Sequence, residues 1–343
     1  MKLPFLSTVY MTLVIGVITI VALIVGKQLF IPLTLGLFLA LTLAPSVAWL
    51  TQHKFPTPLA IATMFLGTGI AIGIIGSVIG IAVKDFADKV PEYITDINDN
   101  IQELRVIVSD KLPIDETVIF DQLNPENLSI IGLKTVSDIF TTTGTIAAGI
   151  GFTLVTTFLL LLYRHRIKKF FEMVATENQQ AGIHTIAQKS FSVLPKYMTG
   201  MIFVIGILAV INSFAFWLIG IPSYLFWGIM VALLNVIPYV GPFIGFGAVT
   251  LFALAVSGPS MAFFAIIAFL ISQFIDNNFL TPIIAAGQIA INPLAAIISI
   301  FIGGMIWGVI GMVLALPTLG LLKIIFDTIP HLQPVGYLIG DKQ

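Results

Sequence analysis

The sequence predicts an all-α polytopic membrane protein with about eight membrane segments, some of them broken or re-entrant helical hairpins, and a small helical extramembrane module. Two observations support this fold class. Hydrophobic residues make up 58% of the 343 residues and charged residues only 10%, against roughly 45–50% and 25% in globular proteins. Several uncharged stretches also reach the roughly 20 residues that a helix needs to cross a bilayer.

The same composition excludes several kinds of protein. The net charge of −1 gives no basic surface for nucleic acid, so no nucleic-acid partner is expected. The chain has no cysteine and four scattered histidines, which excludes disulfides and thiol nucleophiles and argues against a metal site. We therefore expect neither a cofactor nor a metal, and the lipid bilayer as the surroundings of the chain.

Residues 1–83 predict three N-terminal spans, at 8–26, 28–50 and 58–83. The first is uncharged over 19 residues. It is longer than the apolar region of a signal peptide and no small-residue cleavage pattern follows it, so we interpret it as a retained span.

Residues 84–140 change in character. Between Lys84 and Asp138 lie five basic and twelve acidic residues, a local net charge of −7. Apolar residues spaced by three and four from Phe86 to Val108 indicate an amphipathic helix and not a span. We predict an acidic extramembrane helical module, acting as a solvated lid or assembly surface in preference to a binding domain.

A fourth span is predicted at 144–163, followed by a basic, amphipathic cytoplasmic segment at 164–198. Lys and Arg near the span ends, above all the cluster at 164–169, place the N-terminus inside and the acidic module outside. The cluster itself is interpreted as a stop-transfer signal that contacts anionic headgroups.

Residues 199–326 form the predicted C-terminal transport core, followed by a tail at 327–343. Within this core the run at 235–245 contains two prolines and two glycines, which exclude one continuous helix. We predict a helical hairpin whose freed backbone groups lie against protein or a wet cavity. Its gate residues are Pro238, Gly241, Pro242 and Gly245.

A second irregular stretch at 293–322 is too long for one ordinary span, and two interpretations stay open. It is either a tilted span followed by an interfacial piece or a second hairpin broken at Gly303-Gly304, although glycines in membrane helices also serve close packing. Two interrupted segments are typical of a transporter site. With two hairpins the C-terminus returns to the cytoplasm. The gate residues assigned to this stretch are Pro293, Gly303, Gly304 and Pro317.

Asp276 is the one charged residue between Lys196 and Lys323. A carboxylate at the centre of a membrane helix costs roughly 3 kcal/mol and is presumed functional. On a helix, Ser272, Gln273, Asp276 and Asn277 share one face. The alternative is a capping role near the headgroups, since Pro282 follows closely. We assign solute or ion binding to Asp276, Asn277, Gln273 and Asn235.

Three stretches of this sequence resemble the autoinducer-2 exporter (AI-2E) family. They are the run from Ile237 to Gly245, with the pattern PxxGPxxG; Asp276-Asn277 followed by Pro282 and Gly287; and Asn292-Pro293-Leu294 leading to the run from Gly308 to Pro317.

The resemblance covers essentially the whole chain. It implies a bacterial cytoplasmic membrane protein, homo-oligomeric assembly such as a pentamer, and an elevator-like movement of the hairpin region, with Pro282 and Gly287 among the gate residues. It does not specify the substrate.

The leading hypothesis is a secondary transporter or exporter of a small polar solute, driven by an ion or solute gradient because no GxxxxGK[ST] pattern occurs. The alternative is a Na⁺(Li⁺)/H⁺ antiporter, in which a cation and a proton compete for Asp276. A non-transporting scaffold is a third hypothesis. An enzyme is not expected, because Asp276 lacks the second carboxylate, the base or the metal ligands that intramembrane hydrolysis requires.

Overall fold

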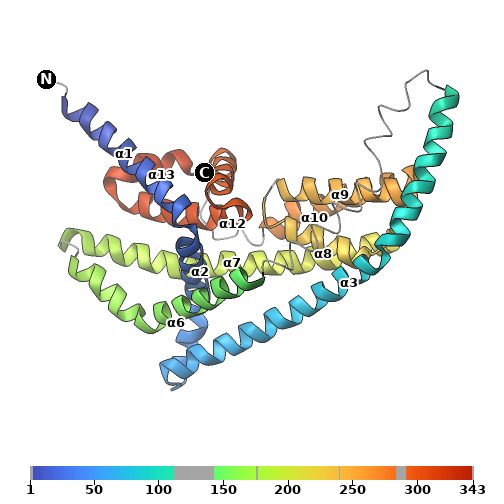
Figure 1. Ribbon diagram of the computed structural model, residues 1–343. Coiled ribbons are helices and arrows are strands. Elements are labelled where there is room, and N and C mark those ends of the chain that lie inside the picture. The colour runs from blue at the N-terminus through green and yellow to red at the C-terminus, as the bar shows by residue number, and fades with distance from the viewer. Residues whose placement is uncertain (1–2, 112–142, 175–176, 239, 283–290, 342–343) are drawn as a thin grey trace. The chain divides into compact units, whose positions relative to one another are not determined.

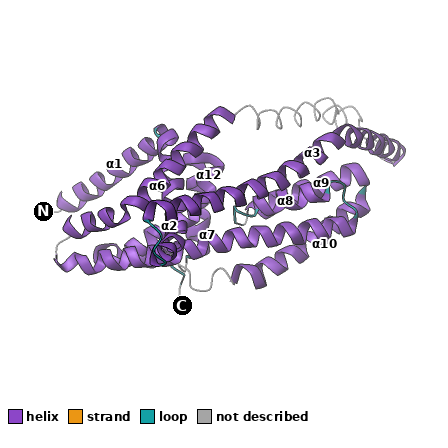
Figure 2. Ribbon diagram, turned by 90° about the horizontal axis from the view of Figure 1, so that it is seen from below, coloured by secondary structure: helices purple, strands orange, loops and turns teal. Residues whose placement is uncertain are grey.

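The computed structural model describes residues 3–111, 143–174, 177–238, 240–282 and 291–341 (Figure 1). These residues are almost entirely helical, and Figure 2 draws no strand among them. Seven of the described helices are long and apolar enough to cross a membrane. This confirms the prediction of an all-α polytopic membrane protein.

The chain divides into two compact units, and neither is continuous in sequence. Unit 1 consists of residues 1–65, 147–199 and 285–343, and unit 2 of residues 66–146 and 200–284. The division was not visible in the sequence, because at 65/66, 146/147 and 199/200 the chain passes from one unit to the other inside continuous helices.

Unit 1 contains α1 (Leu3–Val25), α2 (Lys27–Gln52), most of α6 (Thr143–Val174) and the first part of α7 (Glu177–Ile219). Helices α2 and α6 approach closely at Gly36. The Thr157 hydroxyl donates to the Gly36 carbonyl at 3.2 Å and to the Thr153 carbonyl at 2.7 Å. A small residue facing a hydroxyl is a common way to hold membrane helices together. A buried apolar cluster joins the same helices to the start of α3: Ala40, Ala44, Val47, Leu50, Ala60, Ile61 and Leu161.

The helix α12 (Pro293–Thr328) is a hairpin and not a single rod. Trp307 and Gly308 leave helical geometry, and Gly308 has a φ of 63°, which favours glycine. A Cβ placed on Gly303 would collide with the Gly311 carbonyl, so the two arms fold back against each other there. A second hairpin was one of the two interpretations left open. The predicted break at Gly303-Gly304 was wrong, because these glycines form the arm contact and the chain turns at 307–308.

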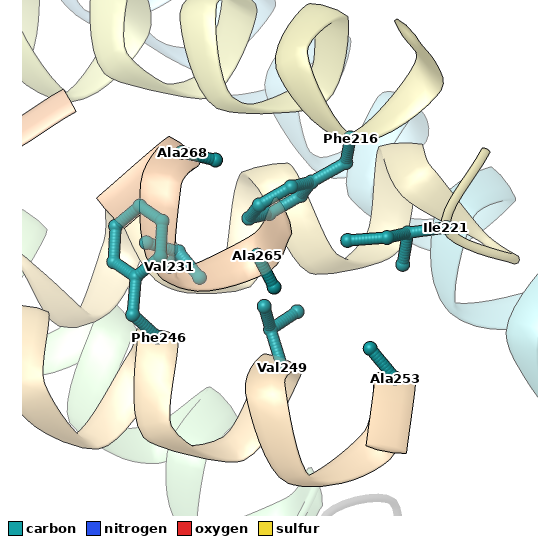
Figure 3. Close-up of a cluster of buried hydrophobic side chains, with 8 residues drawn as sticks. All are labelled: Phe216, Ile221, Val231, Phe246, Val249, Ala253, Ala265 and Ala268. Carbon is teal, nitrogen blue, oxygen red and sulfur yellow. The ribbon is translucent and has the colours of Figure 1, made fainter. Parts of the chain in front are cut away.

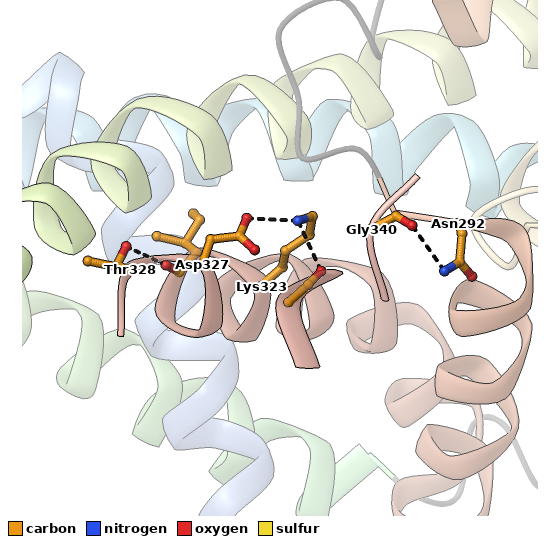
Figure 4. Close-up of polar contacts among 7 residues, drawn as sticks. Asn292, Lys323, Asp327, Thr328 and Gly340 are labelled. Atoms are coloured by element: carbon orange, nitrogen blue, oxygen red, sulfur yellow. Dashed lines mark hydrogen bonds and ion pairs between the residues drawn. The ribbon is translucent and has the colours of Figure 1, made fainter. Parts of the chain in front are cut away.

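The C-terminal segment fastens the two ends of this hairpin (Figure 4). It comprises η3 (Pro330–Leu332) and α13 (Gln333–Ile339). Asn292 caps α12 by accepting from the Ala295 amide at 2.8 Å, and its side chain donates to the carbonyls of Leu338 and Gly340 at 2.7 and 3.1 Å. At the other end Lys323 donates to the Gly336 carbonyl of α13 at 3.4 Å and pairs with Asp327 of its own helix at 2.7 Å. We name residues 330–340 the C-terminal clasp.

Unit 2 contains the outer part of α3 (Thr57–Lys111), the second part of α7, and α8 (Tyr224–Leu234), α9 (Val240–Ser257) and α10 (Pro259–Ile275), with the π-helical turn η2 (Asp276–Leu280) directly after α10. The core packs α7, α8, α9 and α10 around several alanines, which let membrane helices approach (Figure 3). Its buried members are Phe216, Ile221, Val231, Phe246, Val249, Ala253, Ala265 and Ala268.

The chain leaves helical structure after α8 ends at Leu234, over residues 235–238, and α9 begins at Val240, which confirms the predicted first hairpin. The break is shorter than predicted. Gly241, Pro242 and Gly245 lie inside the first turns of α9, where a proline is tolerated because the first helical amides have no partner inside the helix. A Cβ on Gly241 would collide with the Leu234 carbonyl, so glycine is required for the arms to meet.

The amphipathic stretch that begins at residue 84 continues the third span as one helix, α3. In unit 2 its polar residues contact the first hairpin: Ser223 donates to Asp85 at 2.9 Å, Tyr93 and Ser223 share a hydrogen bond at 2.8 Å, and Asn100 donates to the Ala255 carbonyl at 2.9 Å. The remainder of the predicted module, residues 112–142, lies outside the described residues.

Two other predicted boundaries also fall inside helices. The basic cluster at 164–169 continues α6 without interruption, and the predicted boundary at 198/199 lies within α7. The sequence changes in character at these points, but the helical backbone does not end, and α7 continues through Pro195 and Gly200.

Candidate functional site

Asp276 lies in unit 2 at the junction of α10 and the π-helical turn, and only 5% of its surface is exposed. The turn is closed by the Thr281 amide, which donates to the Asp276 carbonyl five residues back. Such π-turns inside α-helices occur often at functional sites, because the extra residue redirects side chains.

Two neutral donors hold the Asp276 carboxylate. The Asn235 amide donates to Oδ2 at 3.0 Å, and the Thr281 hydroxyl donates to Oδ1 at 3.0 Å. No lysine, arginine or histidine of the described part of the chain forms an ion pair with Asp276. Each carboxylate oxygen keeps a further lone pair. The carboxylate is thus hydrogen-bonded but has no cationic partner among the described residues, which suits it to a cation or a hydroxyl-bearing solute.

Asn235 links the carboxylate to the first hairpin, since it is the residue at which α8 ends and the break begins. The structure therefore brings together two of the predicted binding residues, Asp276 and Asn235, within one unit. The prediction of Asn235 rested only on its place at the start of the broken run.

The predicted polar face of α10 is present only in part. Ser272 is buried like Asp276, Gln273 is half-buried and Asn277 is exposed. Among the described residues, neither Gln273 nor Asn277 hydrogen-bonds to the Asp276 carboxylate. The π-turn explains the difference at Asn277, because an i+5 turn rotates the following residues relative to an ideal α-helix.

The predicted gate residues divide between the two units. Pro238, Gly241, Pro242 and Gly245 belong to the hairpin of unit 2, and Pro282 follows the Thr281 donor in the same unit. Pro293, Gly303, Gly304 and Pro317 belong to the hairpin of unit 1, where Gly304 lies against Met312 and Pro317 is buried. Gly287 lies outside the described residues.

Three polar residues of this region were missed in the sequence: Thr281, Asn212 and Ser213. Thr281 donates to the carboxylate, and Asn212 accepts from the predicted Ser272 at 2.7 Å. Asn212 and Ser213 are buried on α7. The Asn-Ser pair could have been noticed, because it lies in the otherwise apolar stretch 199–219, and polar residues in membrane helices often mark function.

Any metal ion here would have to be held mainly by neutral oxygens. No group of three or more His, Asp or Glu side chains that could bind a metal occurs in the portion of the chain that the structure describes. One carboxylate with amide and hydroxyl oxygens is a donor set for a weakly held monovalent cation or a polar organic molecule, and not for a resident transition metal.

The apolar helices, the broken hairpins and the membrane carboxylate together define a multi-pass membrane protein of the transporter class. The chain belongs to the AI-2E family: the family "AI-2E family transporter" matches residues 13–331. It is 27% identical over 332 residues to "Putative transport protein YrrI" of Bacillus subtilis strain 168, covering 93% of this chain and 92% of that protein. It is 23% identical over 323 residues to "AI-2 transport protein TqsA" of Escherichia coli strain K12, covering 92% and 90%.

Proposed function

We propose that this protein is a secondary exporter of a small polar solute, driven by an ion or solute gradient, with its binding site at Asp276 and Asn235. The observation that carries the proposal is the 3.0 Å hydrogen bond from Asn235 to Asp276. It joins a buried membrane charge to the end of a broken helix, and such breaks near membrane charges are where transporters bind their substrates.

In this proposal the hairpin tip, from Asn235 to Gly245, is the gate. The amides of Val236, Ile237, Val240 and Gly241 donate to carbonyls within the hairpin, so a solute would be held there by side chains and not by these amides. Asp276 binds hydroxyl groups of the solute or a coupling ion.

Purified protein in liposomes tests the proposal. Autoinducer-2 is the first solute to load, because TqsA is named as its transport protein. We expect efflux that depends on a gradient and is lost in Asp276→Asn, while Asp88→Asn, at an exposed acidic residue of α3, retains it. Equal efflux from both variants would contradict a role for Asp276.

The second candidate is Na⁺(Li⁺)/H⁺ exchange, favoured by the absence of a cationic partner for Asp276 among the described residues. In liposomes that contain a pH dye, external Na⁺ or Li⁺ would then change the internal pH. The change would require Asp276 and persist in Asp88→Asn. No pH change from correctly inserted protein would exclude this hypothesis. A protein that moves neither ions nor solutes would instead fit the scaffold hypothesis.

We further propose an N-terminus in the cytoplasm of a bacterium, the acidic segment outside, and a homo-oligomeric assembly. The chain has no cysteine, so single cysteines can be introduced and labelled without background. A membrane-impermeant maleimide added to intact cells is expected to label Asp99→Cys and not Lys169→Cys. The opposite pattern would reverse the orientation.

A further inference from the structure

A second polar layer lies one helical turn from Asp276. It is formed by Ser272 on α10 and Asn212 on α7, each only 2% exposed, and the Ser272 hydroxyl donates to the Asn212 amide oxygen at 2.7 Å. Ser272 and Asp276 are four residues apart, so they lie on the same face of α10. The two polar layers are therefore neighbours along one helix face.

The contacts of α7, α8 and α10 place this layer relative to the core. Leu208 on α7 packs with Ala232 on α8 and with Leu280 after α10, beside the Asp276 layer. Phe216, further along α7, packs with Ala265 and Ala268 in the main apolar core. Asn212 lies between these contacts, so the polar layer separates the carboxylate from the apolar core.

An unpartnered hydroxyl in the same stretch of α7 gives a second, independent observation. Ser213 is 8% exposed, and its Oγ has no hydrogen-bond partner in the described structure. Gly228 of α8 lies directly against it, and a Cβ at that position would collide with the Ser213 hydroxyl. A buried hydroxyl without a partner is an exception that calls for an explanation, and a polar ligand that binds there is one.

We propose that Asn212, Ser213 and Ser272 form a second binding station, continuous with Asp276, for the ligand that the protein transports. The proposal rests on the proposed function, since it extends the Asp276 site. The station offers only amide and hydroxyl groups, and Asp276 adds one negative charge. The ligand class is therefore neutral or cationic, presenting hydroxyl groups or hydration water, and anions are rejected because no cationic side chain of the described residues faces them.

The two sources of this chemistry are a neutral polyhydroxylated solute and a hydrated alkali cation. Binding is measured by calorimetry on purified protein in detergent, with autoinducer-2, LiCl and inorganic phosphate as separate probes. We expect one of the first two to bind and phosphate not to bind. Phosphate binding at Asp276, or no binding of any probe by folded wild type, would overturn the proposed ligand class.

The residues of the station are tested with the probe that binds. Asn212→Ala and Ser272→Ala are each expected to weaken binding about tenfold, the effect of losing about 1.4 kcal/mol. Ser272→Thr, which retains a hydroxyl, is expected to bind within about threefold of wild type. The control is Thr157→Val, which removes a buried membrane hydroxyl in unit 1 and should leave binding unchanged.

The outcomes separate the station from the proposed function. If Asn212→Ala and Ser272→Ala bind normally while Asp276→Asn does not, the residues only hold helices together and the station is wrong. If Asp276→Asn also binds normally, the proposed function fails with it. Thermal unfolding of every variant shows whether it is folded, and a variant that fails to fold is replaced by Asn212→Gln, which keeps the amide and lengthens its reach.

Discussion

Substitutions of Asn235 test whether Asp276 is charged and held as the structure describes. Asn235→Ala removes the donor that lies 3.0 Å from Asp276 Oδ2 and leaves the Thr281 hydroxyl in place. A hydrogen bond to a charged group contributes about 1.5–3 kcal/mol. We expect the free energy of unfolding to fall by about that amount.

Asn235→Asp makes the sharper comparison, because it keeps the shape of the side chain and replaces the donor by a second carboxylate. Two like charges about 3 Å apart repel by roughly 5 kcal/mol at an effective dielectric constant of about 20. Asn235→Asp should therefore be less stable than Asn235→Ala near neutral pH.

The assay is thermal unfolding in detergent micelles, followed by the fluorescence of the four tryptophans. Thr281→Val serves as the matched variant for the other carboxylate oxygen, and we expect a smaller loss of about 1 kcal/mol because Thr281 is more exposed. If Asn235→Asp proved as stable as Asn235→Ala near neutral pH, the reasoning would be refuted, since replacing the amide donor by a second carboxyl group would then cost no stability.

Three further predictions concern the packing of each unit. Gly311→Ala is expected to cost about 1–3 kcal/mol of stability, because its Cβ would collide with the Gly303 carbonyl; unfolding midpoints unchanged from wild type would show that the arms are not in contact. Tyr93→Phe should lower the free energy of unfolding by about 1 kcal/mol. Ser223 donates its only hydroxyl hydrogen to Asp85, so the Tyr93 hydroxyl is the donor to Ser223, and the variant loses that hydrogen bond. The rate of amide hydrogen exchange at 221–226 should then rise. Asn292→Ala removes an N-cap and two donors to the clasp, and limited proteolysis should then cleave the C-terminal clasp faster than in wild type.

Much of the fold could be predicted, because the bilayer imposes simple requirements. Uncharged stretches of sufficient length became α1, α2 and the apolar parts of α3, α6 and α7. The break after Asn235 was predictable from Pro238 and the neighbouring glycines. The second break was misplaced by one helical turn. Gly303 and Gly308 look equally permissive in the sequence, and only the contact between the arms shows which one packs and which one turns.

The candidate site was harder to predict than the fold. Asp276 could be found because a single membrane carboxylate is costly. Its partners could not be deduced from helical spacing, because the π-turn changes the register after residue 276 and brings Thr281 to the carboxylate where Asn277 was expected. Asn212 is 64 residues away from Asp276 in sequence, and its role depends on how α7 packs against α10. Such pairings are tertiary, and local patterns do not contain them.

The two hairpins are held closed by the same kind of contact, but the polar groups at their breaks differ. This difference argues for different roles. In each hairpin a glycine, which has no Cβ, lets its arm lie against a backbone carbonyl of the other arm. Gly241 lies against the Leu234 carbonyl in unit 2, and Gly303 lies against the Gly311 carbonyl in unit 1. The first hairpin has its tip at the membrane carboxylate, through Asn235. In the second hairpin, Trp307 lies at the break, and its indole N–H donates to the Leu23 carbonyl of α1 at 3.0 Å. Since a buried charge attracts water and polar solutes whereas an indole anchored to a helix does not, we expect ligand selectivity to reside in the first hairpin. For the second hairpin we expect a packing role.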